Sequence, residues 1–350
     1  LRPEAELIYN TGQLEASLEY LYSMKYYDDR ANSADHRHRF GGDIKYQLTP
    51  RATISVDEEF VIAQESEILD PTGVFTTRSS GNNIRNTISF SGLYEMTRLL
   101  ATEVSYSNNY INYDDSGVSS RSALLDRIEH RIGGNLRWEA ATTTKYLVGY
   151  DFGVKDQTSD DFLTGTTSSS VRDNRSHYGY VGVDHDFSTK FHASLRTGVQ
   201  YTEYPNLPVG ADDTTINPYA DGNLSYDFRK DSSIQLGVRH NRSQTDVFAL
   251  DAALSPTLDA ETSTVYGALT YGFTAKIKGT VNSQLQYSTF ERGAADSSND
   301  LFLLVGASLD YEITEYLTAQ AGYSYDRLDS DQVLRSFTRN RVYLGFRATY

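Results

Sequence analysis

The amino-acid sequence predicts an all-β protein: a transmembrane antiparallel up-and-down β-barrel formed by one domain, residues 1–350. Three observations lead to this prediction. Apolar and polar side chains alternate with a period of two, which is typical of strands because successive side chains point to opposite faces. Short turn-forming breaks recur at intervals of roughly 40–47 residues, with longer polar stretches between them. The alternating segments are about ten to fifteen residues long, which suits a tilted strand that crosses a bilayer.

The breaks define hairpins with short turns at one end and long loops at the other. The short breaks are Thr49-Pro50, Met96-Thr97, Thr142-Thr143, Ser188-Thr189, Lys230-Asp231, Thr274-Ala275 and Thr314-Glu315. The long stretches are Asp28–Asp35, Glu65–Ser80, Asp114–Ala123, Thr158–Asn174, Pro205–Asn217, Val247–Asp259, Glu291–Asn299 and Leu328–Phe337. Counted from Leu14, residues 14–350 give sixteen strands in eight hairpins, an arrangement typical of bacterial outer-membrane barrels.

The last strand indicates which solvent lies on each side of the sheet. Residues 340–350 read NRVYLGFRATY, so Leu344 and Phe346 lie in one row while Arg341 and Arg347 lie in the other. Arginines on an inner face would be intolerable in the dry core of a soluble sandwich. We therefore expect the apolar row to face lipid and the polar row to face a water-filled lumen. A soluble sandwich or propeller is the alternative, but its strands would usually be only five or six residues long.

Residues 1–13 leave the strand number open. Residues 4–10 alternate and end at the break Thr11-Gly12, but a strand there would run in the same direction as the last one. Parallel neighbours contradict the even-numbered antiparallel arrangement of these barrels. Either residues 1–13 form a periplasmic segment outside a wall of sixteen strands, or a preceding strand in the full-length parent gives eighteen. The clean alternation of Ala5, Leu7 and Tyr9 favours eighteen.

Composition and motifs exclude several classes of function. A net charge of −15 argues against nucleic acid as a partner, because phosphate binding needs a basic surface. There is no cysteine, so disulfides and thiolate metal sites are excluded. No HExxH, GxSxG or phosphate-cradling glycine loop occurs, and we expect neither an enzyme nor a cofactor. The chain begins at Leu1 without methionine or a signal peptide, as expected of a processed or truncated product.

Charged side chains of both signs occupy the polar row. The candidates for lining the lumen are Arg127, Arg131, Arg137, Arg339, Arg341, Arg347, Asp184, Asp186, Glu59 and Arg85. One interpretation is a solvated wall that holds ladders of opposite charges. The other is a transverse field that orients a polar or charged solute. For the second, the two arginine-rich strands, residues 127–137 and 339–347, are the best candidates for guiding anions.

The charges on the polar row roughly cancel, so the excess of acidic residues lies in the loops. Two interpretations of these loop carboxylates stay open. The carboxylates form a solvated rim, or they bind Ca²⁺ alone or as a bridge to lipopolysaccharide phosphates. The candidates are the pairs Asp160/Asp161 and Asp329/Asp331, which offer the oxygen ligands that Ca²⁺ accepts. Neither pair has the spacing of a dedicated calcium loop.

The last strand and the first hairpin carry a resemblance to known proteins. The alternating residues Val342, Leu344, Phe346 and Ala348 end on Tyr350, which resembles the assembly signal of bacterial outer-membrane barrels, although Phe is commoner than Tyr at that position. The segment RPEAELIYNTGQLEASLEYLYSMKYY is similar to β-barrel porins encoded beside exopolysaccharide loci in Gram-negative bacteria. The resemblance implies a location in the outer membrane and a transport function.

Three functions remain open: a passive conduit for polysaccharide export, a diffusion porin for small polar solutes or ions, and a structural or surface-binding barrel. The expected partners are outer-membrane lipid and lipopolysaccharide, together with the transported polysaccharide or small solute. Tyrosines near strand ends, such as Tyr20, Tyr22 and Tyr106, are typical of an interfacial girdle. Glu58 lies in the apolar row, where it marks a candidate contact in an oligomer. Glu65–Ser80 and Thr158–Asn174 are long enough to fold inward as a constriction.

Overall fold

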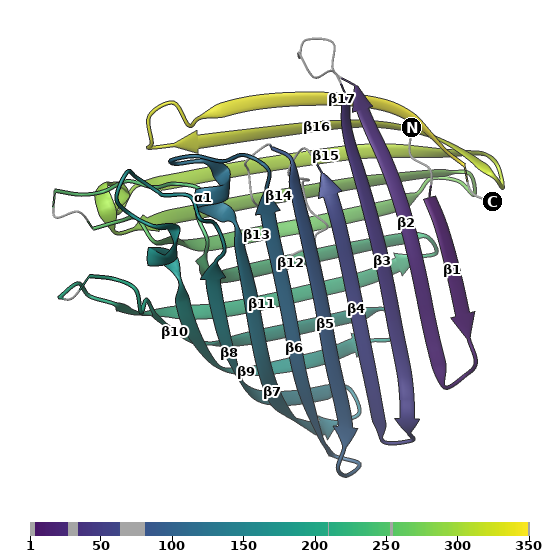
Figure 1. Cartoon of the computed structure of the whole chain (residues 1–350). Coiled ribbons are helices and arrows are strands. Elements are labelled where there is room, and N and C mark those ends of the chain that lie inside the picture. Colours follow the sequence, from purple (N-terminus) through teal and green to yellow (C-terminus); the bar gives the residue numbers. More distant parts are fainter. Residues whose placement is uncertain (1–3, 27–33, 64–80, 209, 253–254, 349–350) are drawn as a thin grey trace. The chain divides into compact units, whose positions relative to one another are not determined.

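The computed structural model describes residues 4–26, 34–63, 81–208, 210–252 and 255–348. Within these ranges, seventeen strands belong to one sheet, and strands that follow one another in sequence form antiparallel hairpins (Figure 1). The predicted loop Glu65–Ser80 and the terminal Tyr350 lie outside the described residues.

The strand bounds follow the alternating segments closely. In chain order the strands are β1 (Glu4–Asn10), β2 (Leu14–Tyr26), β3 (Ala34–Thr49), β4 (Ala52–Ala63), β5 (Asn83–Glu95), β6 (Leu100–Tyr113), β7 (Arg127–Ala141), β8 (Thr144–Gln157), β9 (Asn174–Ser188), β10 (Phe191–Glu203), β11 (Thr214–Arg229), β12 (Ser232–Ser243), β13 (Asp259–Gly272), β14 (Ile277–Glu291), β15 (Asn299–Thr314), β16 (Leu317–Ser330) and β17 (Phe337–Ala348). The sixteen strands expected from Leu14 onward are confirmed in the described part of the chain.

Residues 4–10 are part of the sheet. β1 pairs with β2 along its whole length, from Glu4 opposite Leu21 to Asn10 opposite Glu15. The interpretation that puts this segment outside the wall is therefore wrong for residues 4–10, because its backbone hydrogen bonds are made to β2. The eighteen-strand interpretation stays a prediction.

The chain divides into two compact units. The first holds β1–β8, together with β9 up to Val181 and β10 from Val199. The second holds β12–β17, β11 from Asn217, and the remainder of β9 and β10. In the first unit β2–β8 pair successively, and in the second β11–β17 do the same.

Short turns occur where the breaks in the alternation predict them. Several of the adjoining strand ends carry a register shift, for example between Gln47 and Thr49 and between Glu139 and Ala141. In the Lys230-Asp231 turn, Asp231 has a φ of 55°, a left-handed conformation that aspartate tolerates better than most residues. The hairpin turns thus follow from local sequence.

The long connections contain helical turns that the alternation did not predict: α1 (Arg121–Leu125), η1 (Ser169–Arg172) and η2 (Gly293–Ala295). α1 begins at Ser120, whose hydroxyl accepts a hydrogen bond from the Ala123 amide at 3.0 Å, as N-cap residues do. It ends at Asp126, where the backbone is extended, and Leu125 packs against Ile111. No helix in the described residues is long and apolar enough to cross a membrane.

The two faces of the sheet differ in the way the alternation predicts. In β17, Val342, Leu344 and Phe346 expose 76, 82 and 62% of their surface, and these rows form what we call the apolar face. The rows that contain Arg39, Arg131 and Arg341 form the polar face. Buried apolar clusters occur instead near the long connections, as with Val247, Ala260, Phe290 and Ala295. This arrangement is the reverse of that in a soluble sandwich.

Candidate functional site: the polar face of the sheet

In the first unit, one arginine links three strands on the polar face. Arg39 on β3 lies 3.0 Å from a carboxylate oxygen of Glu19 on β2 and 2.7 Å from one of Glu59 on β4. The three side chains share a face because alternate residues of neighbouring strands do so. Arg39 is 31% exposed, so solvent reaches the triad. The predicted lumen residue Glu59 is therefore paired.

The arginines of β7 are paired in the same way. Nη2 of Arg131 lies 2.7 Å from Asp151 on β8, and its guanidinium stacks over the Tyr178 ring with 4.0 Å to the centroid. Arg137 forms an ion pair with Glu103 on β6. Each pair joins two adjacent strands, so it also fixes their registration.

Arg127, at the start of β7, is almost fully buried. Its Nε donates to Glu129 at 2.6 Å, and its Nη1 donates to the Leu125 carbonyl at 2.9 Å. Lys155 on β8 lies 3.6 Å from the same Glu129 carboxylate. Burial of a guanidinium is tolerable only with such partners, so Arg127 supports the wall where the long connection meets it.

In the second unit, the arginines of β17 converge on one carboxylate. The side chain of Asp326 on β16 is fully buried, 2.8 Å from Arg339 and 3.3 Å from Arg341. Arg347, the third arginine in this row, lies opposite Thr318. The register places Asp326 directly opposite Arg339, so strand pairing brings this cluster together.

The remaining predicted lumen residues are distributed along other strands. Asp184 lies 3.4 Å from Arg196, and Asp186 lies 2.5 Å from Nδ1 of His192. Arg85 on β5 lies opposite Val61 and Ile111. Five of the six arginines on the two arginine-rich strands, Arg127, Arg131, Arg137, Arg339 and Arg341, therefore have carboxylate partners.

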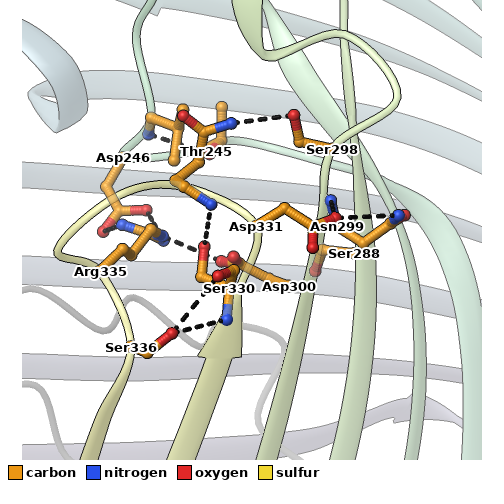
Figure 2. A network of polar contacts seen from close by, with 12 residues as sticks. Thr245, Asp246, Ser288, Ser298, Asn299, Asp300, Ser330, Asp331, Arg335 and Ser336 are labelled. Atoms are coloured by element: carbon orange, nitrogen blue, oxygen red, sulfur yellow. Dashed lines mark hydrogen bonds and ion pairs between the residues drawn. The ribbon is translucent and has the colours of Figure 1, made fainter.

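One arginine in the β16–β17 connection contacts the β12–β13 connection and the start of β15 in the second unit. Arg335, between β16 and β17, donates from Nη1 to Asp246 at 3.0 Å and from Nε to Asp300 at 3.0 Å (Figure 2). Burial lowers the pKa of Arg335, but the two carboxylates outweigh it and raise the pKa above its usual value. Sequence reasoning missed this residue, since Asp246 is 89 positions away and loops carry no periodic signal.

A buried carboxylate organises the β6–β7 connection of the first unit. Asp126 is 2% exposed and accepts hydrogen bonds from the Tyr113 amide at 2.7 Å and the Ser122 hydroxyl at 2.6 Å. Burial raises the pKa of Asp126 to about 6, although these hydrogen bonds lower it. Asp126 thus holds the end of β6 against α1.

The predicted calcium candidates bond to protein donors. Asp161 accepts from the Gly117 amide at 2.9 Å, Asp331 accepts from the Asn299 amide at 2.8 Å, and Asp329 pairs with Arg327 at 2.9 Å. Asp160 is exposed. In the described parts of the chain, no group of three or more His, Cys, Asp or Glu side chains is arranged to hold a metal ion. Calcium binding by the two acidic pairs stays a prediction.

One part of the chain matches a known protein family. Residues 259–350 match the family model described as "Putative beta-barrel porin 2". The match covers β13–β17, so it includes the last strand but not the first hairpin, on which the resemblance to porins beside exopolysaccharide loci rested. No curated protein matches the chain significantly.

Solved structures match nearly the whole chain at low identity. BauA, the ferric preacinetobactin receptor from Acinetobacter baumannii, is 10% identical with a TM-score of 0.53, covering 98% of this chain and 63% of that one. The FrpB iron transporter from Neisseria meningitidis is 10% identical with a TM-score of 0.47, covering 93% and 59%. The chain therefore spans less than two thirds of the length of either protein.

The likeness to BauA shows the fold, and the polar face has the alternation expected of a barrel wall. The chain is a transmembrane β-barrel of the bacterial outer membrane, and its β13–β17 segment matches the porin family described as "Putative beta-barrel porin 2".

Proposed function

We propose that the chain is an outer-membrane conduit for a polar polymer of low net charge, and that it serves polysaccharide export. The observation that carries the proposal is the compensation of charge on the polar face. Arg39 lies between two carboxylates, Arg131 faces Asp151, and Asp326 is shared by two arginines. Neighbouring opposite charges cancel at a distance, so such a wall offers hydrogen bonds to hydroxyl groups without attracting ions of one sign.

Burial along the strands favours a conduit that is closed at rest over an open pore. On the polar face of β14, Gln284, Gln286 and Ser288 are at most 6% exposed, while Lys278, nearer the short turn, is exposed. Phe302 and Leu304 on β15 are likewise buried. On β14 and β15 these polar-row residues are thus covered toward the long connections, and Lys278 on β14 is accessible toward the short turn. A pore that is always open needs access along the whole face.

Conductance and secretion together test this function. The purified chain in a planar bilayer is expected to give rare openings with a reversal potential near zero in asymmetric KCl, and added neutral oligosaccharide is expected to block those openings. A strain without the gene is expected to lose extracellular polysaccharide and to recover it on complementation. Unchanged secretion in the deletion strain would reject the export function.

A diffusion porin is the second candidate, because the family description of residues 259–350 names a porin. Liposome swelling separates the two functions. Fast swelling in small sugars, with steady open currents, is the outcome expected of a porin. Slow swelling that stays slow as the sugar becomes smaller is expected of a conduit closed at rest.

A further inference from the structure

Four tyrosine–histidine pairs lie on the apolar face of the first unit. Each histidine is the third to fifth residue of a strand that begins at a long connection: His36 and His38 on β3, His130 on β7, and His177 on β9. We call these histidines and their tyrosine partners the His–Tyr girdle. In every pair the phenolic oxygen lies 2.6–3.0 Å from Nδ1, in Tyr22–His36, Tyr20–His38, Tyr106–His130 and Tyr150–His177.

The tyrosines lean toward the long connections. Tyr22 is directly opposite His38, yet its hydroxyl contacts His36, two residues nearer the long connection. Tyr106 is opposite Ile132 but contacts His130, which is again two residues nearer. Rings with an apolar body and a polar tip orient in this way where hydrocarbon gives way to lipid headgroups. The lean therefore places the girdle at a membrane interface.

The contacts of His130 indicate which nitrogen carries hydrogen. The Asn108 side-chain nitrogen, which can only donate, lies 3.2 Å from Nδ1 of His130, and the Tyr106 hydroxyl lies 2.9 Å from the same atom. Nδ1 is then an acceptor, and the neutral ring carries its hydrogen on Nε2. His130 thus keeps one N–H that its Tyr106 partner does not use.

The surroundings of three histidines on this face suit an anion. Tyr22 and Ile62 lie opposite His38, and Asn108 and Val154 lie opposite His130. His177 differs, because charged residues occupy nearby positions in the apolar rows of β8, β9 and β10: Asp156, Arg175 and Glu203. Met24 on β2 lies opposite His36, so none of these directly opposite positions holds a carboxylate. The carboxylate of Asp156, which lies opposite Ile128, is a diagonal neighbour of His130 on the same face.

The short-turn end of the same unit carries different chemistry. There Trp138 and Tyr146 contact each other with 5.9 Å between ring centroids, and Tyr46 and Tyr94 are about half exposed on the apolar face. This end resembles the general aromatic girdle of barrels. The four Tyr–His pairs of this unit thus lie at the end of the long connections, while the described short-turn end of the same unit carries tyrosine and tryptophan.

We propose that the His–Tyr girdle binds the phosphate groups of outer-leaflet lipopolysaccharide. Long connections face the exterior in outer-membrane barrels, so the girdle lies at the headgroup level of that leaflet. Hydrogen bonds from N–H groups to phosphate are strengthened by its charge and by the low dielectric at the interface. The occupant is a lipid, because the girdle lies on the face turned to the acyl chains.

Lipid binding to the intact barrel in nanodiscs tests the proposal. The probes are bisphosphorylated lipid A and its dephosphorylated form, measured by native mass spectrometry. The wild-type barrel is expected to prefer the phosphorylated form at least tenfold, and the triple variant His36→Phe/His38→Phe/His130→Phe to lose that preference. The matching glutamine variant, which restores N–H donors, is expected to recover part of it, and His185→Phe at the short-turn end is expected to leave it unchanged.

Folding of each variant is checked by the shift in gel migration on heating, so loss of the fold is separated from loss of binding. Equal binding of both lipids to the wild-type barrel, or a preference that survives in the folded triple variant, overturns the proposal. Displacement of lipid A by millimolar inorganic phosphate also overturns it, because the girdle would then recognise a free anion rather than a lipid.

Discussion

The hydroxyl of Tyr22 on β2 lies 2.8 Å from Nδ1 of His36 on β3, two residues beyond His38, its direct cross-strand neighbour. This diagonal contact joins two strands and at the same time directs a polar ring tip along the sheet. Contacts of this kind add a few tenths of a kcal/mol to about 1 kcal/mol to strand pairing. These contacts also give the apolar face a direction, because the ring tips point toward the end that carries the long connections.

The Arg39 triad predicts a change in ion selectivity. In Arg39→Ala, Glu19 and Glu59 lose their cation, and we expect the conduit to become severalfold more selective for K⁺ over Cl⁻. Because the triad is partly exposed, the loss of stability is expected to be only about 1 kcal/mol. Reversal potentials in asymmetric KCl measure the effect. Arg39→Lys keeps the charge and serves as the control; equal selectivity in all three proteins contradicts the prediction.

The contacts of Arg335 predict that one side chain orders the β12–β13 and β16–β17 connections. Arg335→Ala leaves the buried Asp300 without this cation, and we expect a loss of about 3 kcal/mol with faster proteolysis within residues 244–252. Urea unfolding and limited proteolysis of the folded barrel measure the two effects. Arg327→Ala is the matched control, because its pair with Asp329 is about half exposed and such surface pairs contribute little to stability. Similar losses in both variants would count against the assignment.

The raised pKa of Asp126 predicts that the stability of the folded barrel falls as pH rises. Burial raises its pKa from 3.8 to about 6, so the folded state binds the proton more tightly than the unfolded state. The stability that protonated Asp126 contributes is complete below pH 3.8 and is lost as pH rises through about 6. Relative to Asp126→Asn, the wild-type barrel is expected to lose on the order of 2–3 kcal/mol between pH 4 and 7. Parallel urea-unfolding profiles for the two proteins exclude this role.

The backbone at Gly293 has no room for a side chain, so even an alanine there is expected to destabilise the protein. Its φ is +66°, and a Cβ there would lie 2.2 Å from the Ala249 carbonyl oxygen and 2.5 Å from the Thr257 amide nitrogen. Gly293→Ala is expected to destabilise the β14–β15 connection by about 2 kcal/mol or more, from the left-handed backbone and the clash together. Gly92→Ala, where no atom lies within 4 Å, is the control. Thermal unfolding of both variants decides whether the effect is specific.

The sequence was sufficient to predict the strands. Alternation and turn residues are local signals, and they predicted the hairpin from Leu14 and the breaks at Thr49 and Lys230 because a half-exposed strand imposes a period of two. Pairing then brings Asp326 opposite Arg339, so this contact also follows from register. The helical turn at Ser120 was missed because five residues are too few for a period to show.

The loop contacts could not be predicted in the same way. Arg335 meets Asp246 through the paths of two separate connections, and nothing in either segment specifies the other. Charge compensation around Arg131 and Arg137 was likewise open, since the sequence gives the face of each side chain but not the cross-strand neighbour that it reaches. Both depend on tertiary geometry rather than on local pattern.

Arg335 also constrains the order of assembly. Its partners come from the β12–β13 connection and from the start of β15, and the arginine itself precedes β17. No single hairpin contains Arg335, Asp246 and Asp300, so their contacts form only after several hairpins have paired. We therefore expect these contacts to form late in folding, after the hairpins themselves.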